Sequence, residues 1–166
     1  MILGMSVGTF TLLHVIISLV GIAAGAVVLF AMIGDRPSRG WTALFLATTV
    51  LTSATGFLFH SASFGPPHVI GALSLVLLAV ALLALYGQRL AGIWRPVYVI
   101  CAVFALYLNV FVGVVQAFQK IPALNALAPK GSEPPFLAAQ AVVLIGFIVF
   151  GYLAVRRFHP SRSALD

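Results

Sequence analysis

The chain has 166 residues, of which 62% are hydrophobic and only 7% are charged, and its formal net charge is +6. Soluble domains carry about 25% charged residues, so this composition excludes a soluble globular protein. With a mean hydropathy of +1.16, it indicates a single transmembrane domain over residues 1–166. The arginines flank apolar runs instead of interleaving with aromatic residues, so we expect a lipid bilayer and no nucleic acid as the partner.

Five apolar runs are long enough to cross a bilayer as helices, which takes about 20 residues each. The breaks between them contain the glycines, prolines and charged residues that interrupt helices. We therefore predict an all-α fold, a polytopic transmembrane helical bundle. The predicted spans are about 6–33, 41–61, 67–87, 95–118 and 135–156.

The longest break, 119–135, contains the stretch IPALNALAP. Its apolar residues Ile121, Leu124, Leu127 and Ala128 have helix-like spacing. This pattern predicts a short interfacial helix outside the bilayer core, which could cover the bundle, dock a partner or simply pack.

The basic residues predict an orientation, because cytoplasmic segments carry the excess of Lys and Arg. With the N-terminus outside, only Lys120 and Lys130 lie outside, and seven arginines lie inside. We therefore predict N-out, C-in. The inside arginines are Arg36, Arg39, Arg89, Arg95, Arg156, Arg157 and Arg162.

Three of the four histidines are predicted to lie at one depth near the outer face. His14 precedes Ile33 by 19 residues, His60 follows Trp41 by 19, and His68 precedes Gly87 by 19. At 1.5 Å per helical residue each lies ~28 Å from the inner boundary. Ionisable side chains at membrane depth are functional hypotheses by default, so this layer is the candidate site.

Other polar residues are expected to lead toward this layer. On the fourth span Asn109, Gly113 and Gln116 follow helical spacing, and Gln116 reaches the depth of the histidines. Gln140 on the fifth span lies slightly deeper. The alternative reading is structural, since polar residues in membrane bundles commonly serve as interhelical hydrogen-bond donors and acceptors.

The histidines permit more than one occupant. His14, His60 and His68 with an open position would suit a transition metal such as zinc or copper, and two histidines from facing helices would suit a b-type haem. Gln116 and Gln140 would then support the ligands by hydrogen bonds. No nucleophile–base–acid set is visible, so catalytic residues and enzymatic activity stay open.

Three functions compete on this pattern. The first is a histidine-ligated haem or metal near the outer face, in electron transfer or metal handling. The second is an accessory or assembly subunit of a larger membrane complex, or a homo-oligomer, without chemistry of its own. The third is binding of a small molecule or a quinone in the polar bundle core.

The stretches TGFLFH (55–60), ALYLNVFVGVVQAFQKIPALNALAP (105–129) and SEPPFLAAQ (132–140) resemble an uncharacterised family of small polytopic inner-membrane proteins in proteobacteria. The resemblance covers most of the chain and implies helix content and a bacterial inner-membrane location. With the N-out orientation predicted from the basic residues, the N-terminus would then be periplasmic. It implies no activity. Members of that family often have proline where His60 stands, which implies that His60 is an optional member of the histidine layer.

Overall fold

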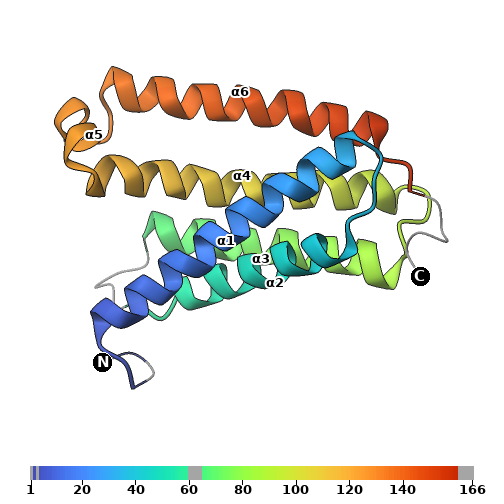
Figure 1. Cartoon of the computed structure of the whole chain (residues 1–166), viewed down its shortest axis with the longest axis horizontal. Coiled ribbons are helices and arrows are strands. Elements are labelled where there is room, and N and C mark those ends of the chain that lie inside the picture. The colour runs from blue at the N-terminus through green and yellow to red at the C-terminus, as the bar shows by residue number, and fades with distance from the viewer. Residues whose placement is uncertain (1, 3, 60–64, 161–166) are drawn as a thin grey trace.

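The chain is helical throughout most of the computed structural model, which describes residues 2, 4–59 and 65–160. Figure 1 shows the long helices lying lengthwise beside one another, with α1 crossing diagonally over the rest. The short helix α5 connects α4 to α6, and the π-helical turn η1 continues α3. The elements are α1 (Val7–Ile33), α2 (Arg39–Gly56), α3 (Pro66–Leu82), η1 (Leu83–Gly87), α4 (Trp94–Lys120), α5 (Pro122–Leu127) and α6 (Pro134–Arg157).

Four helices are long and apolar enough to cross a membrane: α1, α3 continued by η1, α4 and α6. The predicted all-α, multi-pass membrane class is therefore confirmed. The second span is shorter in the structure than predicted: α2 has 18 residues and ends at Gly56, whereas the predicted span ended at about residue 61. Its lower hydropathy comes from six hydroxyl side chains, which are Thr42, Thr48, Thr49, Thr52, Ser53 and Thr55.

Local sequence signals set where several helices begin. The Ser6 hydroxyl accepts a hydrogen bond from the Thr9 N–H (3.1 Å) and caps α1. Prolines occupy the first turns of α3, α5 and α6, where the missing N–H costs no helical hydrogen bond. The short helix predicted within 119–135 is α5, and the Asn125 side chain donates to the Phe118 carbonyl (3.2 Å), which ties it to α4.

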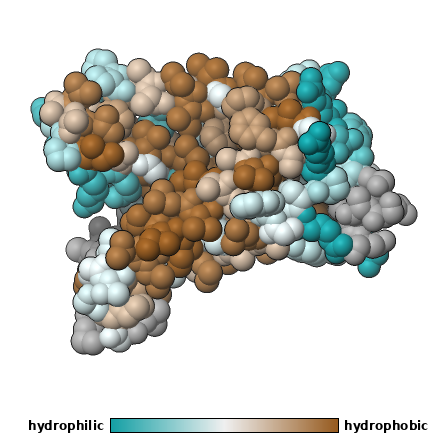
Figure 2. Space-filling model, in the orientation of Figure 1, coloured by the Kyte–Doolittle hydropathy of each residue, from teal (hydrophilic) through white to brown (hydrophobic). Residues whose placement is uncertain are grey.

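The two ends of the bundle differ in charge. One end holds the segments 34–38, 88–93 and 158–160, and we call it the arginine end; the end with the N-terminus, α5 and residues 57–59 is the histidine end. In Figure 2 hydrophilic residues gather at the arginine end, and apolar residues cover much of the rest. Large apolar side chains are exposed on every long helix, as expected for a surface that faces lipid instead of water.

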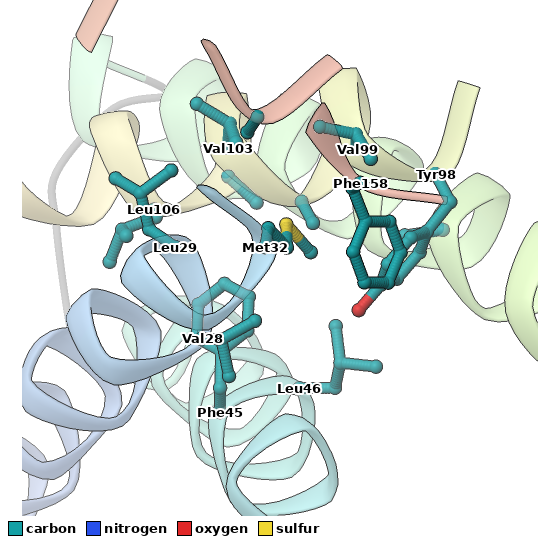
Figure 3. Packing of buried hydrophobic residues seen from close by; sticks show 14 of the residues in the cluster. Val28, Leu29, Met32, Phe45, Leu46, Tyr98, Val99, Val103, Leu106 and Phe158 are labelled. Carbon is teal, nitrogen blue, oxygen red and sulfur yellow. The ribbon is translucent and has the colours of Figure 1, made fainter. Parts of the chain in front are cut away.

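The buried apolar core lies toward the arginine end. It is formed by the second half of α1, the first half of α4 and facing residues of α2, α3 and η1. Figure 3 shows Val28, Phe45 and Leu106 converging from α1, α2 and α4, and Phe158 closing the core beside Tyr98. Arg95 donates to the Val155 carbonyl (3.0 Å), which holds the end of α6 against the start of α4.

Gly25 lets α1 pass close to α2 and α4. A Cβ atom at this position would lie 2.9 Å from two ring carbons of Phe45 and would collide with the Leu106 side chain. Both neighbours are almost fully buried and have little room to move, since protein interiors are close-packed. Gly25 is therefore required for this helix crossing.

We predict that Gly25→Leu lowers the free energy of unfolding by about 1–3 kcal/mol or more, because overpacking forces side chains and backbone apart. The measurement is the thermal unfolding midpoint in detergent. The matched control is Gly146→Leu, since a Cβ at Gly146 on α6 meets no atom within 4 Å. Equal midpoints for both variants would contradict the close approach at Gly25.

Candidate functional site

His14 is hydrogen-bonded across the α1–α2 interface. Its Nδ1 lies 2.8 Å from the Thr55 hydroxyl, and its ring packs edge-on against Phe59 with centroids 5.1 Å apart. Thr55 donates its own proton back to the Leu51 carbonyl (2.6 Å), one turn earlier. The Thr55 oxygen must therefore accept from His14, which places the proton of the neutral imidazole on Nδ1.

This bond determines what His14 offers its surroundings. A neutral imidazole with the proton on Nδ1 carries its lone pair on Nε2. No described residue is hydrogen-bonded to His14 Nε2. Thr55 thus fixes the orientation of the His14 ring, and His14 Nε2 is the hydrogen-bond acceptor that the ring presents.

His68 has the opposite arrangement. It lies in the first turn of α3, and its Nδ1 accepts a hydrogen bond from the Gly65 N–H (3.2 Å). Because Nδ1 is the acceptor, the proton of the neutral ring lies on Nε2. The Phe57 ring lies beside it, with centroids 5.7 Å apart. One histidine of the pair therefore offers a lone pair at Nε2, and the other carries a proton there.

His14 and His68 line the same cavity. It has a volume of about 110 Å³ and lies among α1, α2, α3 and α4 in the half of the bundle toward the histidine end. We call it the histidine cavity. Its polar lining comes from His14, Thr52, Ser53, His68, Ser74 and Asn109, and Phe57, Leu108 and Val112 supply part of the apolar wall.

Several polar atoms beside the histidine cavity have no hydrogen-bond partner within the described residues. They include the Thr52 hydroxyl and the Asn109 amide nitrogen, which belong to residues that line the cavity, and the Thr49 hydroxyl. An unpaired buried polar group costs about 1–3 kcal/mol. These unpaired groups lie around the residues of the histidine cavity and make this part of the bundle the candidate site.

Gly21 brings these groups together. A Cβ at Gly21 would lie 3.1 Å from the Thr48 hydroxyl and 3.4 Å from both the Thr49 hydroxyl and the Asn109 amide nitrogen. The missing side chain thus lets α2 and α4 direct polar groups at the α1 backbone. Small residues at helix interfaces allow such approaches in membranes.

The other predicted site residues have different positions. Gln116 is exposed and does not line the histidine cavity. Gln140 donates to the Phe111 carbonyl (3.2 Å) on the α4–α6 side of the bundle. His60 lies outside the described residues. The proposed ligand and supporting roles of these three residues stay predictions.

Two contributors were not singled out by the sequence. Thr55, which orients His14, is one of several hydroxyl residues on α2, and nothing in the spacing alone marks it as the partner. Ser74 lines the cavity and is 4% exposed. It follows His68 and Gly71 at steps of three residues, and that small and polar seam was the available signal.

The described residues fit a haem or a metal ion poorly. Sites for larger ligands usually have volumes of about 300–1,000 Å³, well above that of the histidine cavity. A metal needs a lone pair from each histidine, but His68 uses its Nδ1 lone pair for Gly65. No group of three or more His, Cys, Asp or Glu in the described part of the chain is arranged to hold a metal.

Glu133, the acidic residue in the segment before α6, is engaged locally. Its carboxylate accepts hydrogen bonds from the Lys130 and Ser132 N–H groups, each at 3.0 Å. The bond from the Lys130 backbone is the main reason that the pKa of Glu133 is lowered. It therefore structures its own loop and is not among the residues of the histidine cavity.

Comparisons of the chain with protein-family models, with curated proteins and with solved structures find no match. The site must accordingly be judged by its own chemistry.

We predict that Thr49→Val raises the free energy of unfolding by about 1 kcal/mol, because it removes a buried hydroxyl that has no partner in the described structure. Thr48→Val is the matched control on the adjacent residue, since the Thr48 hydroxyl donates to the Leu44 carbonyl (2.7 Å). Thermal unfolding of both variants tests the difference. Destabilisation by Thr49→Val alone would mean that this hydroxyl has a partner.

Proposed function

We propose that the chain is a five-span protein of the bacterial inner membrane, with a periplasmic N-terminus and a cytoplasmic C-terminus. The four apolar helices support four of the spans. The fifth would be α2, whose 18 residues correspond to ~27 Å of helix. Its hydroxyl residues would be tolerated in the bilayer because Thr42, Thr49 and Ser53 are buried among the other helices.

The charge distribution supports this orientation. Six arginines of the described chain belong to segments at the arginine end, and Lys120 and Lys130 belong to the histidine end. By the positive-inside rule the arginine end is cytoplasmic. The histidine cavity would then open in the periplasmic half of the bilayer.

The orientation predicts thiol accessibility. In a Cys101→Ser background, Ser132→Cys should react with a membrane-impermeant maleimide on intact cells, and Ser38→Cys should react only after the membrane is permeabilised. If α2 crosses the membrane, an epitope at the N-terminus should be accessible from the outside, as Ser132→Cys should be. Accessibility of Ser38→Cys from outside would contradict the proposed orientation, and an internal N-terminal epitope would contradict the fifth span.

Within this membrane protein, the histidine cavity is proposed to bind the head group of a neutral, membrane-soluble molecule of the quinone or quinol class. The observation that carries the proposal is the His14 acceptor, oriented by Thr55, on a cavity that hydroxyl and amide side chains also line. An acceptor at His14 and hydroxyl or amide donors from Thr52, Ser53 or Asn109 are complementary to a ligand that both donates and accepts hydrogen bonds.

The charge and size of the cavity support the same class of ligand. Among the described residues, the lining contains no Asp, Glu, Lys or Arg, so a charged ligand would enter without a counter-ion from them, which is costly. A volume of about 110 Å³ suits a small ring better than a whole cofactor. A tail would extend outside the cavity, where the helices expose apolar side chains to lipid.

The other hypotheses have less support. A b-type haem or a transition metal at His14 and His68 would require a wider cavity and a different protonation of His68. An accessory or assembly role, or a homo-oligomer, stays a prediction, because no feature of the described surface selects a protein partner.

Binding tests the proposal directly. The purified wild-type protein should bind a short-chain ubiquinone in isothermal titration, and His14→Leu should weaken the affinity by about ten-fold or more, because a buried polar partner is lost. Asn109→Leu, on the facing helix α4, should weaken it as well. His159→Leu is the matched control, since His159 is exposed beyond the end of α6.

Two outcomes would overturn this assignment. The first is the absence of ubiquinone binding by a folded wild-type protein. The second is stoichiometric zinc, copper or haem in the purified protein that is lost in His14→Leu and retained in His159→Leu. That second result would restore a histidine-ligated cofactor as the function of the layer.

A further inference from the structure

An apolar groove runs between α4 and α6, which lie beside each other at one edge of the bundle (Figure 1). Its volume is about 430 Å³, and its lining extends from Ile100 to Tyr107 on α4 and from Leu144 to Val155 on α6. We call it the α4–α6 groove. Ala154 is the one buried residue of α6, so this helix leaves most of its surface, including its side of the groove, open to lipid.

The α4–α6 groove has the length of one lipid leaflet. Helical residues from Leu144 to Val155 span ~16 Å at 1.5 Å per residue, and half of the hydrocarbon core of a bilayer is about 15 Å. Val155 lies two residues before the end of α6 at Arg157. The groove therefore begins at the arginine end and stops near the middle of the bilayer, within a single leaflet.

The width of the groove suits one hydrocarbon chain and not another helix. A volume of about 430 Å³ over ~16 Å gives a cross-section of ~27 Å², whereas a helix about 10 Å across occupies roughly 80 Å². Gly151 keeps this space open, because a Cβ atom there would lie 3.3 Å from Val103 Cγ1 on the other wall. A larger side chain at residue 151 would fill part of the groove.

The lining selects an apolar occupant. Among the described residues it contains no charged side chain, and its polar side-chain atoms are the hydroxyls of Tyr107 and Tyr152. The Tyr107 ring packs edge-on against Phe147 with centroids 5.6 Å apart, which joins the two walls. A charged or strongly polar molecule would lose its hydration in this groove without gaining partners.

The end of the groove at the arginine end has the opposite character. Arg156 donates to the Tyr152 hydroxyl (3.0 Å), and its guanidinium lies 5.6 Å from the centre of the Tyr152 ring. Tyr152 lines the groove, so it holds the Arg156 charge at the groove's end. A guanidinium has five N–H donors, and this contact leaves others for a ligand.

Other charges at this end do not neutralise Arg156. Among the described residues, Asp35 is the acidic side chain at the arginine end, and it accepts a hydrogen bond from the His159 N–H (2.7 Å). It is not part of the groove lining. Arg95 donates to the Val155 carbonyl (3.0 Å) and adds positive charge beside the same end of the groove.

We infer that the α4–α6 groove binds an anionic phospholipid, with one acyl chain along the groove and the phosphate at Arg156. A guanidinium matches phosphate oxygens with two parallel hydrogen bonds, and basic residues beside transmembrane helices attract anionic lipid head groups. The apolar length and the single charged end are complementary to a molecule of this shape. This site is separate from the histidine cavity and does not depend on its ligand.

Native mass spectrometry of the full-length protein in detergent tests the inference. Phosphatidylglycerol and phosphatidylcholine with identical acyl chains are titrated separately, and the ratio of their affinities is measured. The wild type should prefer phosphatidylglycerol, and Arg156→Gln should lower this preference by about five-fold or more, because a phosphate partner is lost. Arg157→Gln is the matched control, since it removes the same charge from the adjacent exposed residue and should keep the wild-type ratio.

A second pair of variants tests the groove itself. Gly151→Leu should weaken the binding of both lipids, because its side chain occupies the space of the acyl chain. Gly146→Leu is the control, since residue 146 is on α6 but does not line the groove, and it should bind both lipids as the wild type does.

Three results would overturn the inference. The first is equal affinity of the wild type for the two lipids, and the second is an equal effect of Arg156→Gln and Arg157→Gln. The third is a wild-type dimer that Gly151→Leu converts to a monomer without any change in lipid binding, because the groove would then be an interface between two copies of the chain. If Gly151→Leu does not fold, the two arginine variants decide the matter.

Discussion

The helix crossing at Gly21 and Gly25 determines how the rest of the molecule is arranged. At Gly25 the missing side chain lets α1 press against Phe45 and Leu106, and the apolar core continues from there to the arginine end. At Gly21, one turn away, the neighbouring atoms are instead the polar groups of Thr48, Thr49 and Asn109. One crossing thus separates a densely packed apolar half from a polar half.

The polar half carries a stability cost that apolar side chains at the same positions would avoid. Buried hydroxyl and amide groups without partners reduce stability, and here they occur around one cavity together with His14 and His68. His14 is held by Thr55, and His68 is held by the backbone of Gly65. Both rings are thereby fixed in orientation and tautomer before any ligand arrives, which lowers the cost of binding.

Much of this arrangement is predictable from residue counts, and some of it is not. Apolar run lengths predict the long helices because the thickness of the bilayer fixes the length of a span. Depth counting predicts one level for His14 and His68, and both residues line one cavity in the structure. It cannot predict which way Gln116 or Gln140 faces. The long helices expose apolar residues on several sides, so their hydrophobic pattern does not indicate how each helix is rotated about its own axis. The cavity that Arg39 and Arg89 line also escapes prediction, since these arginines resemble ordinary topology signals.

The tautomers of the two histidines test the central claim most directly. Nitrogen NMR of ¹⁵N-histidine-labelled protein, assigned with His14→Leu and His68→Leu, reports which ring nitrogen carries the proton. The account predicts a neutral His14 protonated at Nδ1 and a neutral His68 protonated at Nε2, with the His14 Nε2 signal shifting on addition of a short-chain ubiquinone. Both rings protonated at Nδ1, with Nε2 shifts characteristic of metal coordination, would contradict it.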